Sequence, residues 1–113
     1  MKPCDLIKQT VEIYLKHGWE LRRVLLRPET IALLHAEARF DSLPLRATPV
    51  KEASIDALWF SRASHEQREA WELRHLGENP FALFETFEAD ETEEQREELR
   101  CEMEARMRDH VEK

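Results

Sequence analysis

The stretch that decides the fold is residues 70–87, which read AWELRHLGENPFALFETF. Two apolar-rich segments in it flank Gly-Glu-Asn-Pro, a strong turn signal. We therefore predict two strands, Ala70–Leu76 and Phe81–Phe87, joined by a short turn. A third strand candidate, Ile55–Arg62, comes just before them, after which Ala63–Glu69 is a polar connection. Short connections between successive strands favour an antiparallel meander.

The tetrapeptide Trp-Glu-Leu-Arg in this stretch, residues 71–74, occurs once more at residues 19–22. If the two segments run antiparallel, the glutamate of each faces the arginine of the other, and such charge pairs specify sheet register. We therefore predict that a strand over residues 19–27 lies beside the strand over 70–76. The predicted cross-strand pairs are Glu20 with Arg74 and Arg22 with Glu72.

Two further segments read as helices. Residues 3–17 carry an apolar stripe at helical spacing, and Gly18 suits the position just after a helix end. Residues 29–38 are rich in helix formers and follow Pro28, which suits a helix start. A strand through Thr30–Leu34 is the alternative for this segment.

The last helix is predicted over residues 91–111. Either Asp90 with Glu93 or Thr92 with Gln95 would form a capping box at its start. Its apolar seam is narrow, so most of the helix is expected to be solvated and acidic. The seam consists of Leu99, Met103 and Met107, with Val111 beyond.

These elements predict one α+β domain over residues 1–113, in the order α-β-α-β-β-β-α. A two-layer packing is expected, with a mostly antiparallel sheet of about four strands against helices. Residues 40–54 contain two prolines and little periodicity, so we expect an irregular stretch there. It has room for a short strand around Leu45–Thr48.

Composition narrows the classes of function. The chain has 113 residues, 42% of them hydrophobic and 36% charged, and a net charge of −7. Residues 85–104 hold ten carboxylates against two arginines, a net −8, so the remainder is +1. An acidic chain argues against nucleic-acid binding, which draws its affinity from clustered Lys and Arg. No apolar run approaches the roughly 20 residues of a membrane span.

Cys4 and Cys101 lie near opposite ends of the chain, and no secretory signal is recognised. We therefore expect two reduced thiols in a cytoplasmic protein. A disulfide that joins the two terminal helices is the alternative.

The candidate binding residues are aromatic or basic. The three tryptophans are expected in the core, and an aromatic-lined pocket or partner surface is the alternative. A row formed by Arg22, Arg62 and Arg74 is expected on the other face of the sheet, where guanidinium groups suit carboxylate or phosphate. Leu58, Phe60 and Phe84 are expected on the same face. A pocket between helix and sheet would be edged by Arg23, His75 and the tryptophans. The full set is Trp19, Arg22, Arg23, Trp59, Arg62, Trp71, Arg74 and His75.

No motif in the sequence points to a reaction or to a cofactor. The five histidines have no metal-ligand spacing, and no serine or cysteine lies in a nucleophile motif. We therefore expect no metal, no cofactor and no enzymatic activity.

The remaining class of function is protein–protein contact, and we expect a homodimer or another protein partner. The seam of Leu99, Met103 and Met107 is one candidate interface, because methionines adapt well to such contacts. The acidic last helix is either a solvated face or a docking surface for a basic partner. Element order and acidity resemble those of small secretion chaperones, which are acidic α+β dimers, although no motif is shared. The competing class is a small-molecule binder or enzyme with a pocket between helix and sheet.

Overall fold

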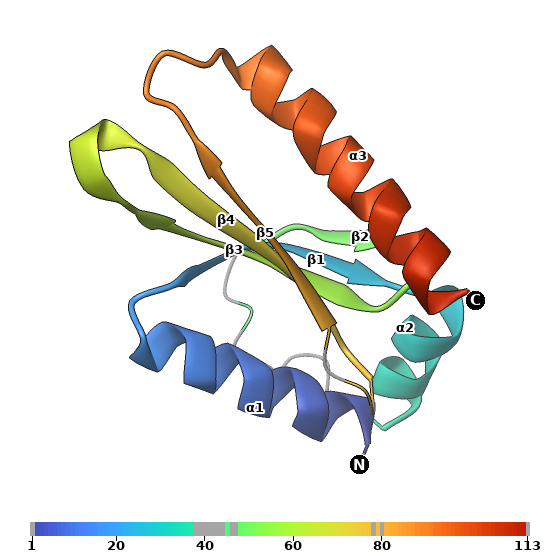
Figure 1. Ribbon diagram of the computed structural model, residues 1–113. Helices are drawn as coiled ribbons and strands as arrows, with labels where there is room; N and C mark the ends of the chain where they lie inside the picture. The colour runs from blue at the N-terminus through green and yellow to red at the C-terminus, as the bar shows by residue number, and fades with distance from the viewer. Residues whose placement is uncertain (1, 38–44, 46–47, 78, 80, 113) are drawn as a thin grey trace.

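A computed structural model describes residues 2–37, 45, 48–77, 79 and 81–112. A five-stranded sheet lies between helices on both of its faces (Figure 1). The helices α1 (Pro3–Lys16) and α2 (Pro28–Ala36) pack on one side, here the α1 face, and α3 (Glu93–Val111) packs on the other, the α3 face. The α+β class is confirmed. The expected two-layer packing is wrong, because the sheet buries apolar side chains on both faces.

The strands are β1 (Glu20–Leu26), β2 (Val50–Glu52), β3 (Ala57–Ala63), β4 (Glu69–His75) and β5 (Phe81–Phe87). Their order in the sheet is β2-β1-β3-β4-β5, and all neighbours are antiparallel except β1 and β2, which are parallel. The predicted meander is thus confirmed, and the helix over residues 28–36 excludes the alternative strand there.

The expected short strand near Leu45–Thr48 falls partly outside the described residues. The strand that the structure shows in this stretch is β2, whose three residues are all exposed, so no apolar pattern marks it. Residues 46–47, and residues 78 and 80 of the predicted turn, lie outside the described part of the chain.

The predicted pairing of the two Trp-Glu-Leu-Arg segments is wrong. β3 lies between β1 and β4 and is antiparallel to both, so those two strands run parallel and apart. Residues 57–61 of β3 are buried without alternation, as expected of a central strand covered on both faces. Burying this run contributes several kcal/mol, whereas a cross-strand charge pair contributes at most about 1. The apolar run therefore decides which strand is central.

A bulge in β1 also changes which way its side chains point. Leu21 lies opposite Phe60 and Arg23 lies opposite Trp59, so no residue of β3 lies directly opposite the intervening Arg22 in the strand register. The alternation of side chains along this strand is therefore interrupted. The side chains of β1 that face α1 are those of Leu21, Val24 and Leu26.

The α3 helix begins at Thr92, which forms a capping box with Gln95. This is the second of the two predicted registers, and it leaves Asp90 outside the cap. Met103 and Met107 are fully buried against the sheet. The cysteines are both free, and their helices cover opposite faces of the sheet, so the alternative of a disulfide is wrong.

Candidate functional site

The sheet divides the predicted binding residues between its two faces. Trp19 belongs to the core of the α1 face, whereas Trp59 and Trp71 belong to that of the α3 face. Arg62 lies over the Trp19 ring, with its guanidinium carbon 4.5 Å from the ring centroid. The predicted set therefore does not form one site.

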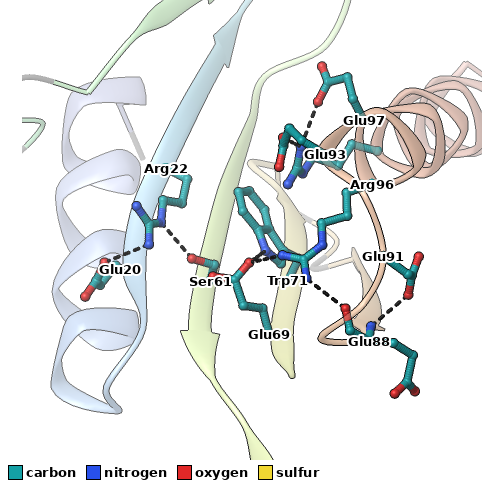
Figure 2. A network of polar contacts seen from close by, with 11 residues as sticks. Glu20, Arg22, Ser61, Glu69, Trp71, Glu88, Glu91, Glu93, Arg96 and Glu97 are labelled. Atoms are coloured by element: carbon teal, nitrogen blue, oxygen red, sulfur yellow. Dashed lines mark hydrogen bonds and ion pairs between the residues drawn. The ribbon is translucent and has the colours of Figure 1, made fainter. Parts of the chain in front are cut away.

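Arg22 leaves the expected row of arginines because of the bulge. Its Nε donates to Ser61 Oγ at 2.7 Å, and its guanidinium pairs with Glu20 at 3.2 Å (Figure 2). Ser61 lies opposite Trp71 on β4, a residue of the α3 face. Arg22 is thus separated from Arg62, which faces α1.

The α3 face is closed by arginines that stack on aromatic rings. Arg100 is only 2% exposed, and its guanidinium lies 4.0 Å from the Trp71 ring centroid. It forms ion pairs with Glu93 at 2.7 Å and Glu97 at 2.9 Å. Burial opposes the charge on Arg100, but hydrogen bonds to the two carboxylates outweigh burial and raise its pKa. The two carboxylates neutralise Arg100, although its Nε has no hydrogen-bond partner. Arg100 was not predicted from the sequence because it lies on a helix face that was expected to be solvated.

Most polar groups around this cluster have partners, although the Nε of Arg96 has none. Trp59 Nε1 donates to Glu104 at 2.8 Å, and Arg23 pairs with Glu97 at 2.9 Å. Arg96 pairs with Glu69 at 2.8 Å and donates to the backbone oxygen of Glu88 (Figure 2). Each of these contacts ties α3, or the segment leading into it, to the sheet or to itself.

His75 and the expected interface residues also belong to the α3 side. Burial lowers the pKa of His75, against an opposing effect of Asp56. Met103 and Met107 contact the sheet of their own chain, and Leu99 packs partly against the same cluster. In this fold the methionines present no surface to a second copy.

The α1 face, by contrast, is covered only in part. Phe84 on β5 is 54% exposed, although it meets the Trp19 ring edge-on with 6.3 Å between centroids. Beside it on β4, opposite Phe84, lies Glu72. We call this region the open half of the α1 face. Its residues are Ile13, Tyr14, Trp19, Glu72, Arg74 and Phe84.

The turn at the end of α1 positions Tyr14 and Trp19, two residues that border this region. His17 is the C-cap, and Gly18 follows with φ of +87°, a conformation that glycine adopts without strain. The Trp19 amide donates to the Tyr14 carbonyl at 3.0 Å and the Gly18 amide to the Leu15 carbonyl at 3.1 Å. These two bonds form a Schellman motif, and its usual hydrophobic contact is here the edge-on packing of Tyr14 and Trp19. The predicted role of Gly18 is confirmed.

A pocket of about 290 Å³ opens between the end of α1 and β4. Its lining combines apolar and polar side chains: Ile13, Tyr14, His17, Trp19, Glu72 and Arg74. The Tyr14 ring stacks on Phe60 with 4.0 Å between centroids, and its hydroxyl donates a short hydrogen bond to Glu72. Burial and this bond raise the pKa of Tyr14 to about 12, although Arg74 acts in the opposite direction. The hydroxyl is therefore a permanent donor at neutral pH.

The two edges of the sheet also differ. β2 has three exposed residues, including Lys51 and Glu52, and so resembles the short, charged edges by which proteins avoid strand pairing. β5 has seven residues, five of them apolar, and carries only Glu85 as a charge. No backbone hydrogen bond from another described segment reaches its outer edge. This edge is available to another strand.

Comparisons and geometry leave the function to be argued from these surfaces. Among the described residues, no group of three or more His, Cys, Asp or Glu could hold a metal ion, and no helix is long and apolar enough to cross a membrane. No family model, no curated protein and no solved structure matches this chain.

Proposed function

We propose that this protein acts through protein–protein contact and that its partner at β5 is a second copy of the same chain. The observation that carries the proposal is the open edge of β5, with Phe84 exposed at its centre. Antiparallel pairing of two such edges would satisfy backbone groups that now face solvent. It would also join two five-stranded sheets into one.

The side chains of β5 suit a two-fold axis at its middle residue. In an antiparallel pair centred on Phe84, that ring faces its own copy, while Ala82 faces Thr86 on the same side of the sheet. The small neighbours leave room for the aromatic pair, and such pairs stabilise antiparallel strands. On the α3 side, Phe81 faces Phe87. On that side Leu83 faces Glu85, so the strand is most complementary to itself on the α1 side.

The same arrangement has an electrostatic consequence. A two-fold axis perpendicular to the sheet places both copies of α3 on one face, and the region around this helix carries most of the negative charge. Like charges repel across a Debye length of about 10 Å at 0.1 M salt. We therefore expect the dimer to tighten as salt rises, whereas an interface built on salt bridges would weaken.

Analytical ultracentrifugation across the micromolar range tests the proposal with Phe84→Lys, since lysine on an edge strand blocks pairing. The wild type should change from monomer to dimer as concentration rises, and Phe84→Lys should remain a monomer. Leu33→Lys is the matched control, because Leu33 is 49% exposed but lies on α2. Dimerisation that survives Phe84→Lys, or a wild type that is monomeric at all concentrations, would overturn the proposal.

The cytoplasm is the compartment that we propose for this dimer. Two free thiols, one buried at Cys4 and one exposed at Cys101, suit a reducing environment. Alkylation of native protein from a reducing lysate should label Cys101 and leave Cys4 unmodified. An intermolecular disulfide through Cys101 in freshly isolated protein would argue for an oxidising compartment.

A further inference from the structure

We infer that the pocket between α1 and β4 binds a small monocarboxylate with an apolar or aromatic body, held by Arg74. This inference is independent of the proposed dimer, because the pocket lies between α1 and β4 of a single chain. Its volume of about 290 Å³ is at the small end of the range for ligand sites.

Arg74 supplies the charge that the ligand would meet. Its Nε is buried and has no hydrogen-bond partner. Among the described residues no carboxylate forms an ion pair with it; the nearby acid, Glu72, instead accepts the hydrogen bond of Tyr14. Arg74 also shares a side-chain hydrogen bond with Tyr14, which is neutral and leaves the positive charge without a counter-ion among the described residues. A guanidinium without a counter-ion in a partly buried position favours an anion, and its planar fork matches a carboxylate with two parallel hydrogen bonds.

The surroundings of Arg74 select the kind of anion. Glu72 contributes one negative charge beside it, and the C-terminal end of α1, where partial negative charge accumulates, borders the pocket at His17. A single guanidinium in such surroundings suits one negative charge better than two. None of the described residues that line the pocket lies at a helix N-terminus, the feature that commonly holds phosphate. We therefore expect a carboxylate and not a phosphate group.

The walls of the pocket select the rest of the ligand. The Trp19 ring and the exposed side chain of Ile13 provide apolar surface, and Ile13 is 53% exposed in the empty pocket. Arg62, stacked on Trp19, adds a second positive charge near the entrance. This is a cationic and aromatic site on a chain whose net charge is −7. An aromatic or branched aliphatic body would cover the exposed apolar surface.

The test is titration of the wild-type protein with phenylacetate, followed by ¹H–¹⁵N NMR of the tryptophan indole groups. The Trp19 resonance should shift and saturate with a dissociation constant on the order of 1 mM, since small ligands gain a fraction of a kcal/mol per atom. The Trp59 resonance should stay in place, because its indole binds Glu104 on the opposite face. Phenylacetamide, which lacks the charge, and inorganic phosphate should bind at least tenfold more weakly.

Substitutions separate the charge from the fold. Arg74→Met should weaken phenylacetate binding at least tenfold, and Arg74→Lys should retain only part of the affinity. Arg106→Met, an exposed arginine on α3, is the control and should change nothing. If Arg74→Met fails to fold, the exposed Ile13 gives a second test: Ile13→Glu should weaken binding and Ile13→Lys should strengthen it. Equal binding of acid and amide, or a response unaffected by these changes, would overturn the inference.

The dimer and the pocket can fail separately. Leu33→Lys lies outside both regions, Phe84→Lys disrupts the β5 edge, and Arg74→Met disrupts the pocket. A wild type that stays monomeric at all concentrations but binds phenylacetate would remove the first proposal and leave the second. The reverse result would remove only the second.

Discussion

Arginines and aromatic residues occur on both faces of this sheet, but they form a closed core on the α3 face and a partly exposed surface on the α1 face. On the α3 face, Arg100 is buried, pairs with two glutamates and stacks on Trp71. On the α1 face, Arg74 has a buried Nε without a partner, close to the exposed ring of Phe84. The first arrangement neutralises its guanidinium with two carboxylates of the same chain, although the Nε of Arg100, like that of Arg74, has no hydrogen-bond partner. The second leaves charge and apolar surface available, as a binding surface requires.

The contrast teaches that arginine and tryptophan content alone does not locate a site. Trp19 and Trp71 stand in identical tetrapeptides, yet they face opposite sides of the sheet. Trp71 is covered by Arg100 of α3, whereas Trp19 lines the pocket. What distinguishes them is whether a helix covers the neighbouring strand positions.

The largest difference between the faces should be seen in stability. Trp59 is fully buried, so Trp59→Ala should lower the free energy of unfolding by about 4 kcal/mol. Phe84→Ala should lower it by less than about 1 kcal/mol, because more than half of that ring already contacts solvent. Urea denaturation of both variants, at concentrations that keep the protein monomeric, measures the two losses. Similar losses would show that the α1 face is not open around Phe84.

The second test concerns the arginine that closes the α3 face. Arg100→Ala should destabilise the fold by about 2 kcal/mol, since both the stem packing and the contact with Trp71 are lost. Arg100→Met should lose much less, because it keeps an apolar stem and because Glu93 reaches solvent when its partner is gone. Thermal denaturation of the two variants checks this order, and a reversed order would show that the charge matters more than the packing.

The same cluster gives stability a definite pH dependence. A hydrogen bond from Arg100 lowers the pKa of Glu93, and bonds from Arg23 and Arg100 lower that of Glu97 against an opposing effect of burial. Carboxyl groups with a lowered pKa stabilise the fold above their unfolded value of 4.5, and this contribution is lost as pH falls below it. The free energy of unfolding, measured from pH 6 down to pH 3, should therefore depend less steeply on pH in Arg100→Met than in the wild type.

The third test compares the two helix ends. Gly18→Ala places alanine in a left-handed conformation, and Thr92→Ala removes the cap of α3, so each should destabilise the protein by about 1 kcal/mol. Only Gly18→Ala should also shift the Trp19 indole resonance and weaken phenylacetate binding, because Gly18 forms the turn that holds Trp19. If Thr92→Ala alters the pocket equally, the two faces are coupled and the comparison breaks down.

Local signals in the sequence were sufficient for most elements and insufficient for their arrangement. Gly18, the Thr92 capping box and strand β5 follow from spacing and residue type alone. Strand order does not, because the charge complementarity of the repeated tetrapeptides is weak compared with burial. The unbroken apolar run in β3 was the available signal for a central strand.

The site residues were predicted only in part, for equally local reasons. The bulge that redirects Arg22 depends on pairing with β3, which no single strand reveals. Arg100 was missed because its charge suggested solvent, although its spacing to Met103 and Met107 places it on the buried stripe. Tyr14 lies within the helix predicted over residues 3–17, and its hydrogen bond to Glu72 depends on contact between α1 and β4.

The smallest expected effect on stability comes from the ionisation of Tyr14 on the α1 face, and it is absent at neutral pH. Tyr14 is the single tyrosine of the chain, so tyrosinate absorbance reports it alone. Its pKa of about 12 in the fold, against 10.0 as the ordinary value, means that the folded state holds this proton more tightly. The associated stability is complete below pH 10 and is lost as pH rises toward 12.

Substitutions of Arg74 and Glu72 should move the pKa of Tyr14 in opposite directions. Arg74 lowers the pKa of Tyr14, so Arg74→Met should raise it further, while Glu72→Gln should bring it back toward 10. Arg100→Met, on the other face, should leave the titration unchanged. Because a bound carboxylate would offset the charge of Arg74, phenylacetate should raise the pKa of Tyr14 as Arg74→Met does. A titration midpoint near 10 in the wild type would mean that Tyr14 does not hold Glu72, and Arg74 would then have a carboxylate available within its own chain.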